Sequence, residues 1–251
     1  MQSIKERFWE VDFFRGIAIM MMVTYHLIFN LSYFGNYKID AISGFWLYFA
    51  RTTANIFIVL VGVSLYISYA NVKKTIKEKK NLFMKYLKRG LKIFGWGLII
   101  TVVTRFFLGN GCVIFGILHL IGFSIILAFP FLTLRFWNLP IGVLCIAMGA
   151  YLKGLTFDFS WLLWLGLKPK NFYTVDYFPL LPWFGVVLLG IFLGYLLYSD
   201  GYRKFMLVDL SEFNIIKSLS FLGKHSLLIY LIHQPLIIAL LFLFGIADMK
   251  F

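Results

Sequence analysis

Seven apolar runs limit what this chain can fold into more than any other feature of its sequence. A transmembrane helix needs about 20 mostly apolar residues, and short polar loops separate these runs. The runs are Phe13–Phe34, Gly44–Ala70, Leu91–Gly109, Val113–Leu134, Leu139–Leu152, Tyr177–Tyr198 and His225–Gly245. The sequence therefore predicts an all-α polytopic membrane protein, a bundle of about seven transmembrane helices.

No polar stretch is long enough to build a soluble core of its own, so we expect residues 1–251 to form a single transmembrane domain. The composition agrees, because 61% of the residues are hydrophobic and only 14% are charged. Two further segments, Ser3–Glu10 and Tyr202–Leu222, mix aromatic, aliphatic and charged residues. We expect both to lie along the cytoplasmic interface as amphipathic helices.

The net charge of +13 is concentrated in short loops between apolar runs, which argues against a nucleic-acid partner. One loop and the start of the run after it carry nine basic residues: Lys73, Lys74, Lys77, Lys79, Lys80, Lys85, Lys88, Arg89 and Lys92. Cytoplasmic loops are enriched in lysine and arginine. This loop is therefore expected in the cytoplasm. Because successive spans place their loops on alternate sides of the membrane, the N-terminus is expected in the cytoplasm as well.

The first apolar run carries a polar stripe. At about 3.6 residues per turn, Asp12, Arg15, Met22, His26 and Asn30 share one helix face. Charged groups in hydrocarbon are costly, so this face must meet protein or water. Arg15 lies near the cytoplasmic end, and His26 lies about 16 Å further along. Asp12 is spaced to pair with Arg15, and an open arginine near basic loops would also suit a phosphate-bearing ligand.

Four ionisable residues are predicted at similar depths in four different runs. His26, Arg51 and His119 each lie about seven residues from the outer end of their run, roughly 10 Å below the outer surface, and Arg105 is slightly shallower. A shared water-accessible cavity would explain this coincidence. The alternative is that the arginines snorkel to the outer headgroups, while the histidines bond to nearby backbone.

The segment "VDFFRGIAIMMMVTYHL" resembles the opening helix of membrane-bound acyltransferases, with its Arg-x10-His pattern. It is followed in order by "RTTANIFIVLVGVSLYISY", "FGILHLIGFS", "LPWFGVVLLGIFLG" and "LGKHSLLIYLIHQP". Together these segments resemble the small prokaryotic members of the heparan-alpha-glucosaminide N-acetyltransferase catalytic-domain family. The resemblance covers nearly the whole chain and implies a multi-pass enzyme of a prokaryotic cell membrane.

The resemblance implies transfer of an acetyl or other acyl group from cytoplasmic acyl-CoA to a saccharide or glycolipid across the membrane. The resemblance implies that Arg15 faces the acyl-CoA phosphates, that His26 is catalytic, and that His119 and Arg51 line the acceptor side. His233 lies where related acyltransferases also carry a histidine. With the polar stripe and the shared depth added, the expected site residues are catalytic His26 and His119, cofactor-binding Arg15, Asp12 and His233, and substrate-binding Asn30, Arg51 and Arg105. Acetyl-CoA or another acyl-CoA would be the co-substrate, and no metal is expected. Membrane lipids are the other expected partners, and a homodimer is left open.

One departure from the family concerns the acceptor. The lysosomal relatives carry asparagine at the position of His26, and their catalytic histidine lies in the following lumenal loop. The corresponding loop here, Leu31–Ser43, contains no histidine. The first helix instead resembles the bacterial sugar O-acyltransferases, so both an amine and a hydroxyl acceptor remain open.

Two mechanisms fit His26. It could take the proton from the acceptor as that group attacks the thioester, or it could carry the acyl group itself as an acyl-imidazole. Arg51 or His119 could stabilise the developing oxyanion. Three other classes of protein would also place polar residues inside the membrane: a bis-histidine haem protein, a transporter or channel, and a structural membrane subunit.

Overall fold

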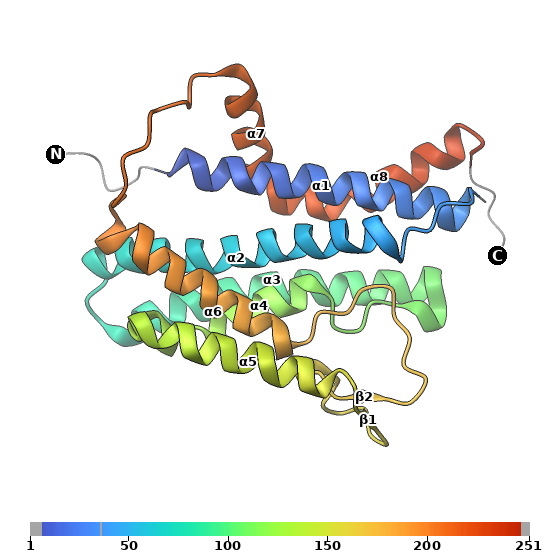
Figure 1. Ribbon diagram of the computed structural model, residues 1–251, viewed down its shortest axis with the longest axis horizontal. Helices are drawn as coiled ribbons and strands as arrows, with labels where there is room; N and C mark the ends of the chain where they lie inside the picture. Colours follow the sequence, from blue (N-terminus) through green and yellow to red (C-terminus); the bar gives the residue numbers. More distant parts are fainter. Residues whose placement is uncertain (1–6, 36, 247–251) are drawn as a thin grey trace. The chain divides into compact units, whose positions relative to one another are not determined.

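The computed structural model describes residues 7–35 and 37–246. These residues are mostly helical (Figure 1). Their α-helices are α1 (Trp9–Phe34), α2 (Gly44–Thr75), α3 (Lys79–Leu108), α4 (Ile117–Leu127), α5 (Asn138–Leu152), α6 (Leu180–Leu197), α7 (Asn214–Lys224) and α8 (Ser226–Leu243). A short parallel pair, β1 (Thr156–Phe157) and β2 (Lys168–Pro169), lies between α5 and α6 in the chain.

Within the described residues, six helical segments are long and apolar enough to cross a membrane. They are α1, α2, α3, α6, α8, and α5 together with the turn that precedes it, Arg135–Leu152. These apolar runs form helices because a helix pairs its own backbone N–H and C=O groups, and lipid offers those groups no hydrogen-bond partners. The predicted fold class, an all-α polytopic membrane protein, is confirmed.

The fourth apolar run forms a shorter helix than its sequence predicts. The expected span was Val113–Leu134, but α4 has only 11 residues and is therefore about 16 Å long. The chain continues through two 3-10 turns, η2 (Pro130–Thr133) and η3 (Arg135–Trp137). Proline accounts for the break, because its ring removes a backbone donor and clashes with the preceding turn. Six long helices and one short apolar helix thus replace the expected seven spans.

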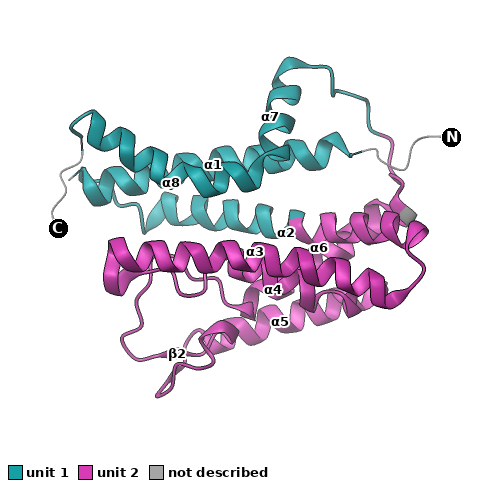
Figure 2. Ribbon diagram, turned by 180° about the vertical axis from the view of Figure 1, so that it is seen from behind, with its two compact units in different colours: residues 1–60, 207–251 teal, residues 61–206 magenta. Residues whose placement is uncertain are grey.

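The chain divides into two compact units (Figure 2). The first comprises Met1–Leu60 and Leu207–Phe251, and the second comprises Val61–Met206, so the boundary falls inside α2. The single domain over residues 1–251 stays a prediction.

In the first unit, α1 packs against both α7 and α8. The contact with α7 depends on glycine at two positions. A Cβ atom at Gly16 would overlap the carbonyl group of Leu219, and one at Gly223 would overlap the carbonyl group of Asp12. The two backbones therefore approach more closely than any larger residue would permit.

Of the two predicted interfacial helices, only Tyr202–Leu222 lies wholly within the described residues. Only the second half of Tyr202–Leu222 is helical, as part of α7. In the segment Ser3–Glu10, residues 3–6 lie outside the described residues, and Glu10 belongs to α1.

In the second unit, α3 packs against α4 and α5 packs against α6. The first of these contacts is also close, since a Cβ atom at Gly122 would meet the backbone of Phe94. Apolar side chains fill the remaining space, with Leu120, Ile125 and Leu188 each at most 1% exposed. This packing holds α4, which carries His119, against α3.

Candidate active site

The polar stripe predicted on α1 lies on the buried side of that helix. Asp12, Met22 and Asn30 are buried, while Arg15 and His26 are half-buried. Exposed residues of the same helix include the apolar Phe14, Met20 and Leu27. The stripe thus faces protein, and apolar side chains face outward, as the cost of charge in hydrocarbon requires.

Two histidines meet between α1 and α8. Nε2 of His233 lies 3.1 Å from Nδ1 of His26, and the ring centroids are 4.8 Å apart. Nδ1 of His26 also lies 3.0 Å from the carbonyl oxygen of Met22, one turn earlier in α1. Nδ1 of His233 lies 2.7 Å from the carbonyl oxygen of Tyr230. The two helices therefore share one imidazole pair.

The hydrogen-bond network assigns the protons of this pair. A carbonyl oxygen only accepts, so the Nδ1 atom that faces one must carry the proton in each neutral ring. His233 then offers the lone pair of its Nε2 atom to the Nδ1–H group of His26. This leaves Nε2 of His26 unprotonated, and no hydrogen bond to that nitrogen is made by the residues that the structure describes. A histidine in this tautomer can act as a base.

A second polar contact joins the same two helices one turn beyond the histidines. Nδ2 of Asn30 donates to Oε1 of Gln234 at 2.7 Å. Asn30 is only 2% exposed, so this bond offsets the cost of burying its amide. The sequence analysis missed Gln234, although a polar residue next to His233 in an apolar run was the available signal.

The N-terminal part of α1 carries an ion pair. Nη1 of Arg15 lies 2.8 Å from Oδ1 of Asp12, and Asp12 is 3% exposed. This is the local pairing that their spacing predicts. The other carboxylate oxygen, Oδ2, is buried without a hydrogen-bond partner in the described part of the chain. Asp12 therefore holds the Arg15 guanidinium close to its own helix.

His119 lies in different surroundings from His26. It is 2% exposed, and its Nδ1 atom accepts a hydrogen bond from the backbone N–H of Gly116 at 3.3 Å. The rings of Phe94 and Phe115 contact it at centroid distances of 5.1 and 5.5 Å. A Cβ atom at Gly97 would lie 2.9 Å from Nδ1. This arrangement caps the first turn of α4, and a catalytic role for His119 stays a prediction.

Asp176, which the sequence analysis did not single out, is the second group at the start of α4. Its Oδ2 atom accepts the backbone N–H of Ile117 at 3.2 Å and lies against Gly116, where a side chain would displace it. The residue as a whole is half-buried, but its carboxyl group is enclosed by protein. Burial raises the pKa of Asp176 to about 6, and the bond from Ile117 opposes this rise only in part.

The two arginines assigned to the outer layer are both exposed. Nη1 of Arg105 donates to the carbonyl oxygen of Gly109 at 3.1 Å, at the carboxyl end of its own helix. Arg51 and His26 belong to the first unit, whereas Arg105 and His119 belong to the second. A common cavity for all four residues therefore stays a prediction.

The fold and the histidine pair define a class of protein: an integral, multi-pass membrane protein with a polar site between two of its helices, α1 and α8. Comparison with known families narrows this class. The family described as "Heparan-alpha-glucosaminide N-acetyltransferase, catalytic" matches residues 7–235, most of the chain. The chain belongs to this family, and the predicted kinship is confirmed: it is a transmembrane acetyltransferase. No curated protein and no solved structure matches the chain.

Proposed function

We propose that this protein transfers an acetyl or other acyl group from cytoplasmic acyl-CoA to an amine or hydroxyl of an extracytoplasmic sugar or glycoconjugate, in a prokaryotic cell membrane, with His26 as the catalytic base. One observation carries the proposal. His26 has its Nδ1 atom held by Met22 and His233, which leaves Nε2 as a lone pair beside the buried stripe of α1.

In the proposed reaction, Nε2 of His26 takes the proton of the acceptor group as that group attacks the thioester carbonyl carbon. The new C–N or C–O bond forms, and the C–S bond of the thioester then breaks. The resulting imidazolium returns the proton to the departing CoA thiolate, so the enzyme ends as it began. If His26 instead carried the acyl group, the same lone pair would form the acyl-imidazole.

The donor would approach from the inner end of α1. Arg15 carries the positive charge there, and its pairing with Asp12 fixes the guanidinium near the helix. About 16 Å of helix separates Arg15 from His26, which suits a nucleotide at the mouth and a thioester at the end of an extended arm. Arg15 and Asp12 thus remain the proposed cofactor-binding residues, and Asn30 remains a proposed acceptor contact.

We assign His233 a positioning role, in place of the cofactor-binding role that the sequence analysis expects. Both of its ring nitrogens are engaged, one with the Tyr230 carbonyl oxygen and one with His26. Such a residue orients the base and selects its tautomer without touching the substrate.

Substitution of His26 tests the proposal. In detergent, with acetyl-CoA and an amino sugar, the release of free CoA thiol measures turnover. We expect His26→Ala to lower kcat by about 100-fold or more, because general-base catalysis contributes roughly 10² to 10⁴ in rate. Binding of acetyl-CoA, measured by calorimetry, should stay within about twofold of the unsubstituted protein.

His225→Ala provides the matched control, because His225 is an exposed histidine at the junction of α7 and α8. It should retain turnover. The proposal fails if His26→Ala turns over at the normal rate, or if both alanine variants lose activity equally.

A further inference from the structure

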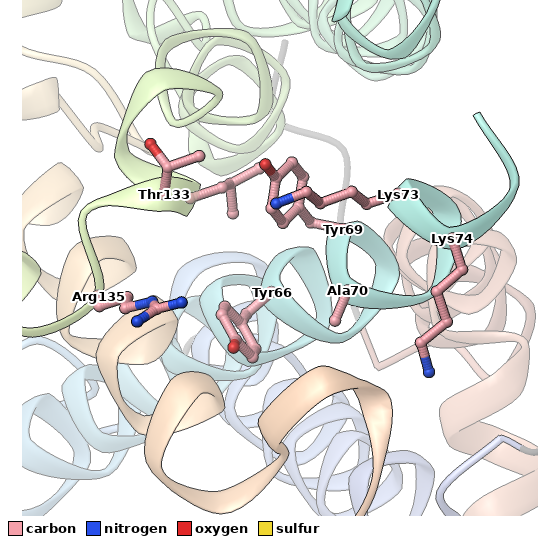
Figure 3. Close-up of a pocket in the computed structure, with 8 residues that line it drawn as sticks. Tyr66, Tyr69, Ala70, Lys73, Lys74, Thr133 and Arg135 are labelled. Carbon is pink, nitrogen blue, oxygen red and sulfur yellow. The ribbon is translucent and has the colours of Figure 1, made fainter. Parts of the chain in front are cut away.

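A cavity of about 360 Å³ lies in the second unit, where the apolar part of α2 gives way to lysines (Figure 3). Its walls combine cationic and hydroxyl groups. They include Lys73, Lys74, Arg135, Tyr66, Tyr69 and Thr133. Neither the histidine pair nor the acetyl-transfer proposal uses any of these residues.

The cavity carries positive charge. Among the described residues, no carboxylate lines it. The Lys73 ammonium lies 5.7 Å from the centre of the Tyr69 ring, and the Lys74 ammonium lies 4.2 Å from that of Tyr202. An aromatic face attracts a cation but leaves its charge uncancelled. The chemistry of this lining therefore suits an anion.

Arg135 reaches the cavity from a constrained turn. Its φ angle is 47°, in the left-handed region that side chains other than glycine seldom adopt. Asn138, only 1% exposed, donates to the carbonyl oxygens of Arg135 and Phe131 at 3.1 and 3.0 Å. The buried amide therefore fixes the backbone of this turn, which places the exposed Arg135 side chain at the edge of the cavity.

The surroundings of the cavity are those of a membrane boundary. Ala70 ends the apolar run of α2, and Lys73 and Lys74 follow within one helical turn. Directly after Arg135, Phe136 and Trp137 are 60% and 68% exposed. Basic residues and exposed aromatic rings mark the level of lipid headgroups. A phospholipid carries both an anionic group and apolar chains, whereas a soluble anion would need no apolar flank.

We propose that this cavity binds the phosphate of an anionic phospholipid, with the acyl chains along Phe136 and Trp137. In Figure 3, the Arg135 guanidinium points toward Tyr66 and the Lys73 side chain folds back over Tyr69. These two cations face the phosphate, and the Tyr69 hydroxyl donates a hydrogen bond to one of its oxygens. In the proposed topology the lipid belongs to the cytoplasmic leaflet.

Native mass spectrometry of the delipidated protein tests this site, by titration with phosphatidylglycerol or with phosphatidylcholine of the same chains. We expect one saturable phosphatidylglycerol molecule and much weaker binding of phosphatidylcholine. Each basic residue contributes about fivefold near an anionic surface, so K73Q/R135Q should weaken phosphatidylglycerol binding by roughly 25-fold. If the double variant does not elute as a folded protein, Lys73→Gln alone should weaken binding about fivefold.

The matched control is K77Q/K80Q, which removes two exposed lysines of the same basic stretch that lie outside the cavity lining. It should bind phosphatidylglycerol as the unsubstituted protein does. Equal losses in both double variants, or equal binding of the two lipids, would overturn the proposal. Displacement of phosphatidylglycerol by acetyl-CoA would also overturn it, since the cavity would then take nucleotide phosphates.

Discussion

At the scale of single residues, the unprotonated state of Nε2 in His26 depends on the hydrogen bonds that its Nδ1 atom makes. Alone on its helix, the imidazole would have only the Met22 carbonyl oxygen as a partner for Nδ1. His233 adds a second acceptor from α8 at 3.1 Å and limits the rotation of the ring. A base that is already oriented loses less freedom when the substrate arrives.

Substitution of His233 should therefore reduce the rate rather than the affinity. We expect His233→Ala to lower kcat by about 100-fold, the scale of a small misplacement of a catalytic group. The KM for acetyl-CoA should change little. His233→Gln, whose carbonyl oxygen can accept from Nδ1 of His26, should recover part of the loss. A raised KM with an unchanged kcat would show instead that His233 binds the donor.

Asp176 should make stability depend on pH in the direction opposite to that of most carboxylates. Its pKa rises from 3.8 to about 6 in the folded protein, so the folded state binds this proton more tightly than the unfolded state. Stability should consequently fall as the pH rises from about 4 to about 6, by at most about 3 kcal/mol for this one group. Below about pH 4 the penalty is absent.

Asp176→Asn removes the charge and keeps an acceptor for the N–H of Ile117. The unfolding midpoint of this variant, measured in detergent by tryptophan fluorescence, should equal that of the unsubstituted protein near pH 4 and exceed it at pH 7. The burial argument would be incorrect if the two proteins had parallel midpoint curves over this range.

At the scale of elements, the packing of α7 on α1 depends on the absence of a side chain. Gly223→Ala would push a methyl group into the Asp12 carbonyl, which neither backbone can avoid without moving. Overpacking of this kind costs about 1–3 kcal/mol. We expect a lower unfolding midpoint in detergent, measured by tryptophan fluorescence.

Gly95→Ala is the control for this prediction, because a Cβ atom at Gly95 in α3 would meet nothing within 4 Å. Alanine also favours a helix over glycine, so this variant should be as stable as the unsubstituted protein or slightly more stable. Equal destabilisation by the two substitutions would indicate a general intolerance of helix glycines instead of a close contact.

The sequence predicted the long helices well because each spanning helix needs a long run of apolar residues, and such runs are visible in the sequence itself. It predicted the polar stripe on α1 because Asp12, His26 and Asn30 are spaced by nearly whole helical turns and therefore share one face. The short α4 was harder, because Pro130 lies inside a run whose apolar composition continues past it. Composition gives the length of a run but not the point where its helix stops.

Contacts between side chains that are far apart in the chain could not be predicted from the sequence. His26 and His233 are 207 positions apart, and nothing in either segment specifies that their ring nitrogens meet. The same holds for Asp176 and Ile117, 59 positions apart, whose contact forms only when the loop folds back onto α4. Such contacts depend on packing between helices, which a periodic pattern within one helix does not contain.

At the scale of the whole molecule, the proposed function requires that donor and acceptor lie on opposite sides of the membrane. The basic loop after α2 predicts the cytoplasmic side, and family membership establishes an acetyltransferase. An acetyltransferase whose donor and acceptor lie on the same side of the membrane would satisfy only the second of these statements. Transfer across the membrane would satisfy both, so it is the step to measure.

Sealed proteoliposomes measure this directly, with protein molecules oriented so that the basic loop faces outward. Radiolabelled acetyl-CoA is added outside, and an amino sugar or a neutral sugar is enclosed inside. The account predicts labelled sugar within the vesicles, its loss in His26→Ala, and its retention in His225→Ala. Labelled product formed only when donor and acceptor share one side, or formed equally by His26→Ala, would contradict it.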